Sequence, residues 1–238
     1  MRDQLIVALD TDAHSALSLA RLLAGRVRWV KVGMTLYYAE GPEIVGRLRE
    51  LGFDIFLDLK LHDIPHQVEG AAREISRLGV SMFTVHTSGG VEMMRAAVEG
   101  ACAGSVECGA DTPDVIGVTV LTSLDDSALT SIGVSGDALS QATRLAGLAR
   151  AAGLQGVVCS PREAHAMRQL LGTEALVVTP GVRPPGSAVS DQARVSTPEE
   201  ALAAGASHIV IGRPITGAID PVAAAVALMG SGEEQTHE

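Results

Sequence analysis

The chain has 238 residues, 47% of them hydrophobic, and a formal net charge of −10. This length and apolar content predict a single domain with a large core over residues 1–229, followed by a polar tail over residues 230–238. The negative charge and an aromatic content of only 3% argue against nucleic-acid binding, because the chain would repel a polyanion and few rings could stack on bases.

The sequence contains no sign of a membrane or secretory segment. No apolar run approaches the roughly 20 residues that span a bilayer, and the apolar stretch after Gln4 lacks a small-residue cleavage site. The three cysteines form no CxxC pair or even framework, so we expect reduced and mostly buried thiols. These features favour a cytoplasmic protein.

Short aliphatic or β-branched runs alternate with segments of helical composition along the whole chain. In chain order, the runs that predict strands are Leu5–Leu9, Trp29–Val32, Ile55–Leu59, Met82–Val85, Val115–Val120, Gly156–Val158, Leu176–Val178 and His208–Ile211. They are apolar on both alternating faces, which is typical of parallel strands covered by helices.

Eight such units predict the α/β class and a closed (β/α)8 TIM barrel as a single domain. A doubly wound sheet is the alternative. It would collect polar residues where the strand order reverses, whereas here they recur after most strands.

Two segments between the seventh and eighth strands have recognisable features. Residues Pro184–Asp191 have no periodicity and lie where a lid loop would be expected. Residues 198–205 predict a helix, with Thr197 as N-cap, Pro198 in the first turn and Gly205 at the end.

Four charged residues follow the first three strands. Asp10 ends the first strand, Lys31 lies within the second, and the third runs into the segment Asp58-Leu59-Lys60. Because side chains alternate along a strand, Asp58 and Lys60 should point the same way, toward the mouth of the barrel. Alternating carboxylates and ammonium groups can offset the cost of burying each alone. The alternative is a set of surface ion pairs, or a network that serves stability only.

The last two strands end in a different kind of segment. Pro180–Arg183 follows the seventh strand and Gly212-Arg213 follows the eighth. Glycine lets backbone N–H groups approach an anion, and an arginine can bind it with two hydrogen bonds. Loops after these two strands commonly hold a phosphate in barrel enzymes, although a plain turn with a solvated arginine is the alternative.

Taken together, these segments resemble the orotidine 5′-phosphate decarboxylase family. The resemblance rests on the order Lys31-Val-Gly, Asp58-x-Lys60-x-x-Asp63-Ile64-Pro65, Pro180-Gly-Val-Arg183 and Ile211-Gly-Arg213, and it covers the chain from the first strand to the eighth. The D-x-K-x-x-D pattern alone would also fit related sugar-phosphate decarboxylases.

The resemblance implies a role for each matching residue. The catalytic charged array would comprise Lys31, Asp58, Lys60 and Asp63, with Asp63 and Ile64 contributed to the site of a second subunit in an obligate homodimer. Other substrate-binding residues would be Asp10 with Lys31 at the ribose, Thr122 at the pyrimidine, Gln192 between base and phosphate, and Arg183, Gly212 and Arg213 at the phosphate. Gln67 stands where the family commonly has threonine, so the contact with the ribose should differ there.

The resemblance also implies a reaction without a metal or organic cofactor. Loss of CO2 from C6 of the pyrimidine leaves an electron pair that the ring cannot delocalise. Lys60 would stabilise this carbanion and protonate it. Repulsion between Asp58 and the substrate carboxylate would contribute less.

Three further interpretations remain open. His62 and His66 have the spacing of metal ligands on a helix, but Pro65 between them favours loop histidines near a subunit interface. A metal-dependent 3-keto-L-gulonate 6-phosphate decarboxylase is the alternative enzyme. A non-catalytic phosphosugar-binding barrel is the alternative outside catalysis, but it should have lost the Asp58 and Lys60 pair.

Overall fold

The computed structural model describes residues 3–183 and 196–230, and its strands form one closed parallel barrel in the order β1 to β8. The strands are β1 (Leu5–Ala8), β2 (Trp29–Gly33), β3 (Asp54–Leu61), β4 (Met82–His86), β5 (Asp114–Val118), β6 (Gly156–Val158), β7 (Leu176–Pro180) and β8 (His208–Ile211). Each pairs with its sequence neighbour, and β1 closes the ring against β8. The predicted (β/α)8 barrel is confirmed.

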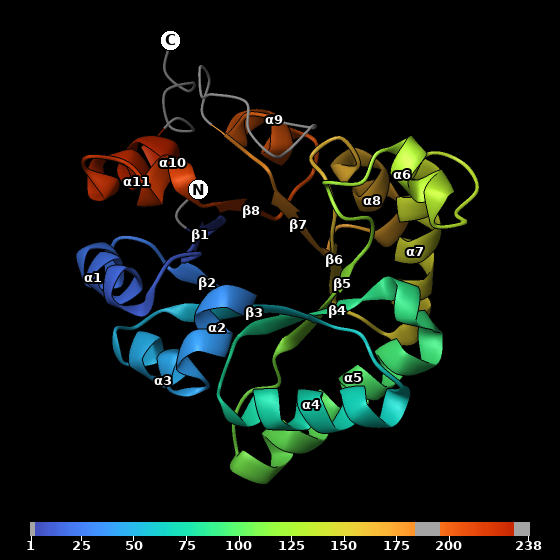
Figure 1. Ribbon diagram of the computed structural model, residues 1–238, viewed down its shortest axis with the longest axis horizontal. Coiled ribbons are helices and arrows are strands. Elements are labelled where there is room, and N and C mark those ends of the chain that lie inside the picture. Colours follow the sequence, from blue (N-terminus) through green and yellow to red (C-terminus); the bar gives the residue numbers. More distant parts are fainter. Residues whose placement is uncertain (1–2, 184–195, 231–238) are drawn as a thin grey trace.

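Helices form a ring outside the strands (Figure 1). They are α1 (Ala13–Leu23), α2 (Met34–Glu40), α3 (Glu43–Glu50), α4 (Pro65–Arg77), the short 3-10 turn η1 (Thr87–Gly89), α5 (Gly90–Cys108), α6 (Asp126–Ser131), α7 (Ala138–Ala152), α8 (Ala164–Leu171), α9 (Pro198–Ala203), α10 (Arg213–Thr216) and α11 (Pro221–Gly230). The described part of the chain contains no helix long and apolar enough to cross a bilayer.

The apolar residues form two layers, one on each face of the strands. Ile6, Trp29, Phe56 and Met82 belong to the cluster that fills the inside of the barrel. Their neighbours along the same strands pack outward against the helices. Burial on both faces explains why the strands read as continuous apolar runs.

Along the inner rows of β2, β3 and β4, side chains change from apolar to polar toward the carboxyl end of the strand. Trp29 is followed by Lys31 on β2, Phe56 by Asp58 on β3, and Met82 by Thr84 on β4. Because side chains alternate, these residues lie on the same face of their strands. The barrel therefore directs its polar groups toward one end.

Strand β3 is longer and less regular than the sequence predicted. It extends from Asp54 to Leu61, and its pairing with β4 shifts register between Leu57 and Leu61. Within this shift, Lys60 has a φ of 54°, the only non-glycine residue with positive φ in the described chain. Regular alternation, which the sequence analysis assumed, does not hold at Lys60.

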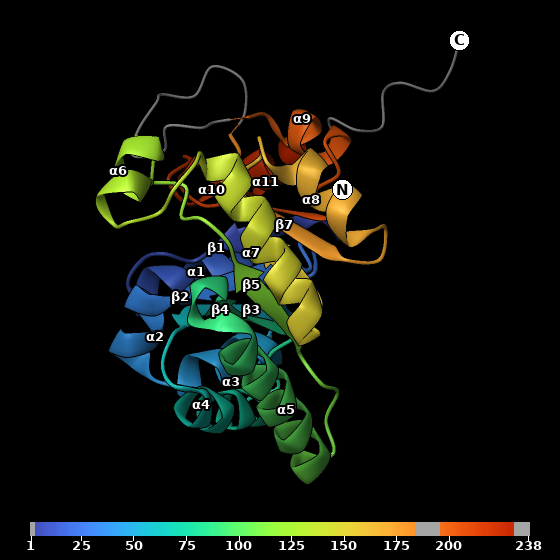
Figure 2. The ribbon, with the colours of Figure 1, turned by 90° about the vertical axis from the view of Figure 1, so that its right-hand side faces the viewer.

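Helices α4 and α5 lie side by side below the barrel in Figures 1 and 2. A Cβ atom on Gly100 or Gly104 of α5 would collide with the backbone of Glu69 or Arg73 on α4. The two glycines thus allow the two helices to approach closely.

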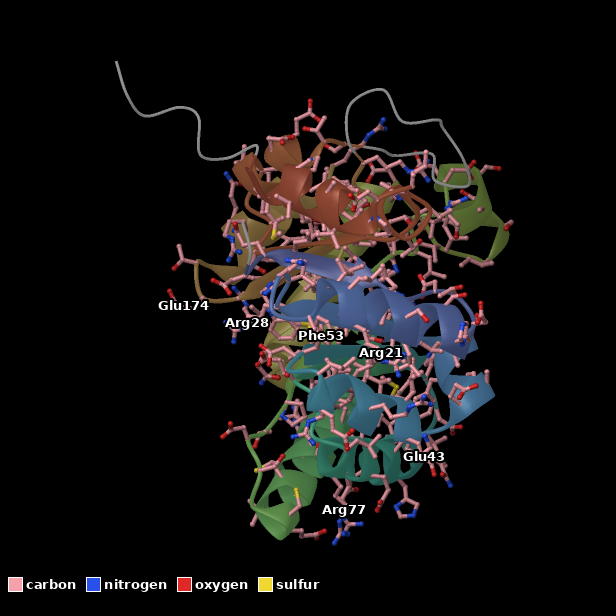
Figure 3. The ribbon with its side chains drawn as sticks, turned by 90° about the vertical axis from the view of Figure 1, so that its left-hand side faces the viewer. Arg21, Arg28, Glu43, Phe53, Arg77 and Glu174 are labelled. Atoms are coloured by element: carbon pink, nitrogen blue, oxygen red, sulfur yellow. The ribbon has the colours of Figure 1, made fainter. Side chains whose placement is uncertain are left out.

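Residues that precede the strands gather at the opposite end of the barrel. Arg28 before β2 and Glu174 before β7 lie on the left in Figure 3. At this end, His208 packs edge-on against Trp29 with ring centroids 5.4 Å apart. Burial and, to a smaller extent, the charge of Arg28 lower the pKa of His208 to about 4.

Helix α9 begins as the sequence predicted. The Thr197 hydroxyl accepts a hydrogen bond from the Glu200 N–H, and the Glu200 carboxylate accepts one from the Thr197 N–H. This capping box explains the sharp start of the helix.

Two smaller expectations were wrong. Cys102 and Cys108 are exposed on α5, so only Cys159 fits the prediction of buried thiols. Residue Gly230, assigned to the tail, is the last residue of α11, while residues 231–238 lie outside the described chain.

Candidate functional site

A cavity of about 490 Å³ opens at the carboxyl ends of the strands. Its lining includes residues that the sequence analysis selected from six different segments, namely Asp10, Lys31, Asp58, Lys60, Thr122, Arg183, Gly212 and Arg213. Its apolar part is formed by inner-row side chains such as Phe56, Val158 and Val210. The barrel thus brings together polar residues that are far apart in the sequence.

Three charges of alternating sign line one side of the cavity. The Asp58 carboxylate oxygen Oδ2 lies 2.8 Å from Lys60 Nζ and 3.5 Å from Lys31 Nζ. The Asp58 side chain is only 13% exposed, and that of Lys31 only 10%. This is a buried ion-pair array, which excludes the alternative of separate surface pairs.

The array controls the ionisation of Asp58. Burial alone would raise the pKa of this carboxyl group, but the charges of Lys31 and Lys60 and hydrogen bonds from Lys60 and Thr84 hold the pKa below its usual value. Asp58 therefore carries its negative charge at neutral pH despite its burial.

Lys31 also bonds the carboxylate that follows β1. Its Nζ donates to Asp10, at 2.8 Å from Oδ1 and 3.2 Å from Oδ2. Both groups lie against Gly33, where a Cβ atom would be 2.6 Å from Asp10 Oδ1 and 3.0 Å from Lys31 Nζ. The glycine of the Lys31-Val-Gly segment therefore leaves the space that this ion pair occupies.

Thr84 on β4 is a member of the site that the sequence analysis missed. Its hydroxyl accepts a hydrogen bond from the backbone N–H of Lys60 and donates one to Asp58 Oδ1. A signal was present in the sequence, because Thr84 is a polar residue on the inner row of an otherwise apolar strand, two positions after Met82.

The other side of the cavity contains the two arginines. Arg183 follows β7 and Arg213 follows β8, next to Gly212, and all three line the cavity. The backbone N–H of Arg183 donates to the Ser196 carbonyl at 3.0 Å, and Val182 pairs with Ser196 in an isolated bridge. Two cations and exposed backbone at the same rim can hold an anionic group.

Three predicted site residues do not line this chain's cavity. Asp63, Ile64 and Gln67 are all exposed, and Ile64 is 64% exposed. The Asp63 carboxylate accepts a hydrogen bond from the Ile64 N–H at 2.7 Å. Gln192 and the expected lid, residues 184–191, lie outside the described residues.

His62 and His66, the two histidines with the spacing of metal ligands, do not lie on the same helix. Pro65 is the first residue of α4 and does not interrupt it, so His66 is helical while His62 precedes the helix. The ring of His62 lies 5.3 Å from that of His86, between centroids. Within residues 3–183 and 196–230, no group of three or more His, Cys, Asp or Glu side chains is arranged to bind a metal ion.

The chain is similar to known proteins over almost its whole length. The model of the orotidine 5′-phosphate decarboxylase / HUMPS family matches residues 3–228. An orotidine 5′-phosphate decarboxylase of Anaeromyxobacter dehalogenans is 49% identical over 227 residues, covering 95% of this chain and 96% of that protein. One from Cutibacterium acnes is 50% identical over 221 residues, covering 92% of each.

A solved structure with a similar fold has the same name as these relatives. The orotidine 5′-phosphate decarboxylase of Lactobacillus acidophilus has a TM-score of 0.83 to this chain at 38% identity, covering 95% of this chain and 97% of that one. The family model, which matches residues 3–228, includes every strand that contributes to the cavity. The fold, the cavity and the relatives agree, and the chain belongs to the orotidine 5′-phosphate decarboxylase / HUMPS family.

Proposed function

We propose that this chain converts orotidine 5′-monophosphate to uridine 5′-monophosphate and CO2, with Lys60 as the group that acts on C6 of the pyrimidine. The observation that supports this most directly is the charge array of Lys31, Asp58 and Lys60, centred on the largely buried Asp58 carboxylate, in the cavity that also contains the two arginines. A cationic donor at one side and an anion-binding rim at the other suit a nucleotide that loses a carboxylate.

In the reaction, the bond between C6 and the carboxylate carbon breaks, and its electron pair stays on C6 in an sp2 orbital. The Lys60 ammonium lies beside this position and stabilises the negative charge as it forms. A proton then passes from Nζ to C6, and the neutral amine regains a proton from water. The fixed orientation of Lys60 is the main source of catalysis, because it exists before the substrate binds and so needs no reorganisation during the reaction.

Asp58 has two roles in this proposal. It holds Lys60 through the 2.8 Å contact. It also repels the substrate carboxylate by roughly 4 kcal/mol if the two groups are about 4 Å apart at an effective dielectric constant of 20. Departure of neutral CO2 removes this repulsion. We rank it below the electrostatic effect of Lys60.

The remaining cavity residues bind the parts of the substrate that do not react. Asp10 and Lys31 bind ribose hydroxyls, and Thr122 contacts the pyrimidine. Arg183, Gly212 and Arg213 bind the phosphate, together with Gln192. Binding at the phosphate is remote from C6, so it can supply free energy that orients the base against Lys60.

Asp63, Ile64 and Gln67 act in a homodimer. They are exposed in the single chain and do not line its own cavity. The partner subunit's Asp63 adds a second carboxylate to the array and completes the alternation around Lys60, while Ile64 is buried against the partner and Gln67 contacts the ribose. Each cavity is therefore shared between two chains.

A spectrophotometric assay with orotidine 5′-monophosphate tests the proposed activity, with one sample treated with a chelator. We expect turnover that the chelator does not change. Loss of activity on chelation, or turnover of 3-keto-L-gulonate 6-phosphate instead, would support the metal-dependent alternative. Binding of the nucleotide without turnover would support a non-catalytic barrel.

The phosphate requirement is tested by comparing this nucleotide with orotidine, which lacks the phosphate. We expect kcat/KM to fall sharply for the nucleoside, because the arginine side of the cavity then contributes no binding energy. Equal values for the two would contradict the assignment of Arg183 and Arg213.

A further inference from the structure

Thr84 lies beneath the charged array and connects two of its members. Its side chain is fully buried on the inner row of β4, and it is not among the residues that line the cavity. Its hydroxyl accepts a hydrogen bond from the Lys60 N–H at 2.9 Å and donates one to Asp58 Oδ1 at 3.0 Å. No other hydroxyl within the described chain both accepts a hydrogen bond from a backbone N–H and donates one to a carboxylate.

The position of Thr84 coincides with the irregularity in β3. Leu57 pairs with Phe83 and Leu61 pairs with Val85, so residues 58–60 of β3 face a single residue of β4, which is Thr84. The extra residues include Lys60 at a φ of 54°. A backbone N–H in this conformation is turned away from the regular ladder of the sheet, and the Thr84 hydroxyl satisfies it.

The same hydroxyl fixes the orientation of the Asp58 carboxylate. One carboxylate oxygen accepts from Thr84, which leaves the other, Oδ2, to face Lys60 and Lys31. The single hydroxyl proton is used in the bond to Asp58, and a lone pair accepts from the Lys60 N–H. One group thus sets both the backbone of Lys60 and the carboxylate that holds its Nζ.

We propose that Thr84 is a positioning residue for the decarboxylation, which orients Lys60 and Asp58 without touching the substrate. This inference rests on the proposed function. It predicts that the hydroxyl, and not the methyl group or the volume of the side chain, determines how accurately the Lys60 ammonium group is placed beside C6 of the substrate.

Three substitutions separate the hydroxyl from the rest of the residue. Thr84→Val has nearly the same shape without the hydroxyl, and Thr84→Ser keeps the hydroxyl. Thr87→Val is the matched control, because Thr87 is also fully buried and its hydroxyl donates to the Val118 carbonyl at 2.8 Å, away from the charged array.

Steady-state kinetics with orotidine 5′-monophosphate provide the first measurement. For Thr84→Val, kcat should fall about tenfold to a hundredfold, as expected for lost hydrogen bonds to a charged group, with KM changed by less than about threefold. Thr84→Ser should restore most of kcat. Thr87→Val should leave both constants close to those of the parent.

A second measurement does not depend on activity. Lys31 and Lys60 are the only two lysines of the chain, so protein with 13C at the lysine ε carbon gives two side-chain NMR signals. Thr84→Val should shift the Lys60 signal, Thr84→Ser should shift it much less, and Thr87→Val should leave it in place. If the parent does not decarboxylate the nucleotide, the proposed function fails, and this comparison still tests the link between Thr84 and Lys60.

Two results would overturn the inference. One is an unchanged Lys60 signal in Thr84→Val. The other is a loss of kcat in Thr84→Ser equal to that in Thr84→Val, since the side-chain volume and not the hydroxyl would then matter. If Thr84→Val does not fold, Thr84→Ala replaces it and is compared with Thr84→Ser by the same two criteria.

Discussion

Replacement of Lys60 by alanine is the most direct test of the proposed chemistry, because the structure predicts that the fold survives it. Asp58 would keep Lys31 at 3.5 Å and the Thr84 hydroxyl at 3.0 Å, so its buried charge would not be left alone. We expect a loss of unfolding free energy of about 1–3 kcal/mol, the range for one interaction of a buried charged group.

The expected loss of activity is much larger. An ammonium about 4 Å from a negative carbon contributes roughly 4 kcal/mol at an effective dielectric constant of 20, which corresponds to about a thousandfold in rate. General acid catalysis contributes a further factor of about 10² to 10⁴. Together these predict that kcat of Lys60→Ala falls by at least about five orders of magnitude.

The assay follows the absorbance change of orotidine 5′-monophosphate, while calorimetry measures the binding of the product nucleotide. Product affinity should change by less than about tenfold, since Lys60 is assigned to the reacting carbon and the phosphate is bound elsewhere. Lys60→Arg is the matched variant, because it keeps a positive charge that does not readily release a proton. Activity of Lys60→Ala within tenfold of the parent would remove this residue from the mechanism.

Three further predictions concern the ion pair between Asp10 and Lys31, the opposite end of the barrel and the proposed dimer. Gly33→Ala should raise KM by about tenfold or more, because the new Cβ would displace the ion pair between Asp10 and Lys31. Gly46→Ala in α3, where a Cβ meets nothing within 4 Å, should leave KM unchanged. Equal KM values for the two variants would contradict this prediction. The pKa of His208 in the folded chain is about 4 and so lies below the ordinary value of 6.5, which means that its contribution to stability is complete above pH 6.5 and is lost as the pH falls toward 4. Urea unfolding of His208→Phe should therefore show a smaller decrease in stability between pH 7 and pH 4, by up to about 3 kcal/mol, and an unchanged decrease would assign the acid sensitivity to other groups. Ile64→Glu should weaken the proposed dimer and the activity together in sedimentation and kinetic measurements, and the control Ile219→Glu, at a more exposed position, should affect neither.

The barrel could be predicted from the sequence because its strands must be apolar on both faces. Runs such as Gly156–Val158 and His208–Ile211 were predicted with the observed boundaries. Other boundaries differed by one or two residues. Asp54 and His86 are paired in strands but lack the apolar character that marks the centre, whereas the buried apolar residues Leu9 and Val120 lie beyond the observed strand ends. The apolar pattern of the sequence indicates which residues are buried, whereas backbone hydrogen bonds determine where each strand begins and ends.

The candidate site was predictable in part for the same reason. Polar residues at the ends of apolar strands have few structural explanations, and Lys31, Asp58 and Lys60 do meet in one cavity. The irregularity at Lys60 could not be predicted, because the register shift depends on the pairing of β3 with β4. The role of Gly33 could not be predicted for a similar reason, since it depends on how the side chain of Lys31 on the same strand meets that of Asp10, which follows β1.

The irregular segment of β3 also explains how a regular barrel can hold an ammonium group beside a carboxylate. In an unbroken strand the residue after Leu59 would continue the ladder with β4, and its N–H would bond to the neighbouring backbone. Here Lys60 adopts a left-handed conformation that costs roughly 1–2 kcal/mol for a residue with a Cβ atom. The hydroxyl of Thr84 and the ion pair with Asp58 can offset this cost, so the conformation depends on the same groups that fix the charges. A lysine held by strain, buried hydrogen bonds and an ion pair has little freedom to reorganise, and little reorganisation during the reaction is what electrostatic catalysis requires.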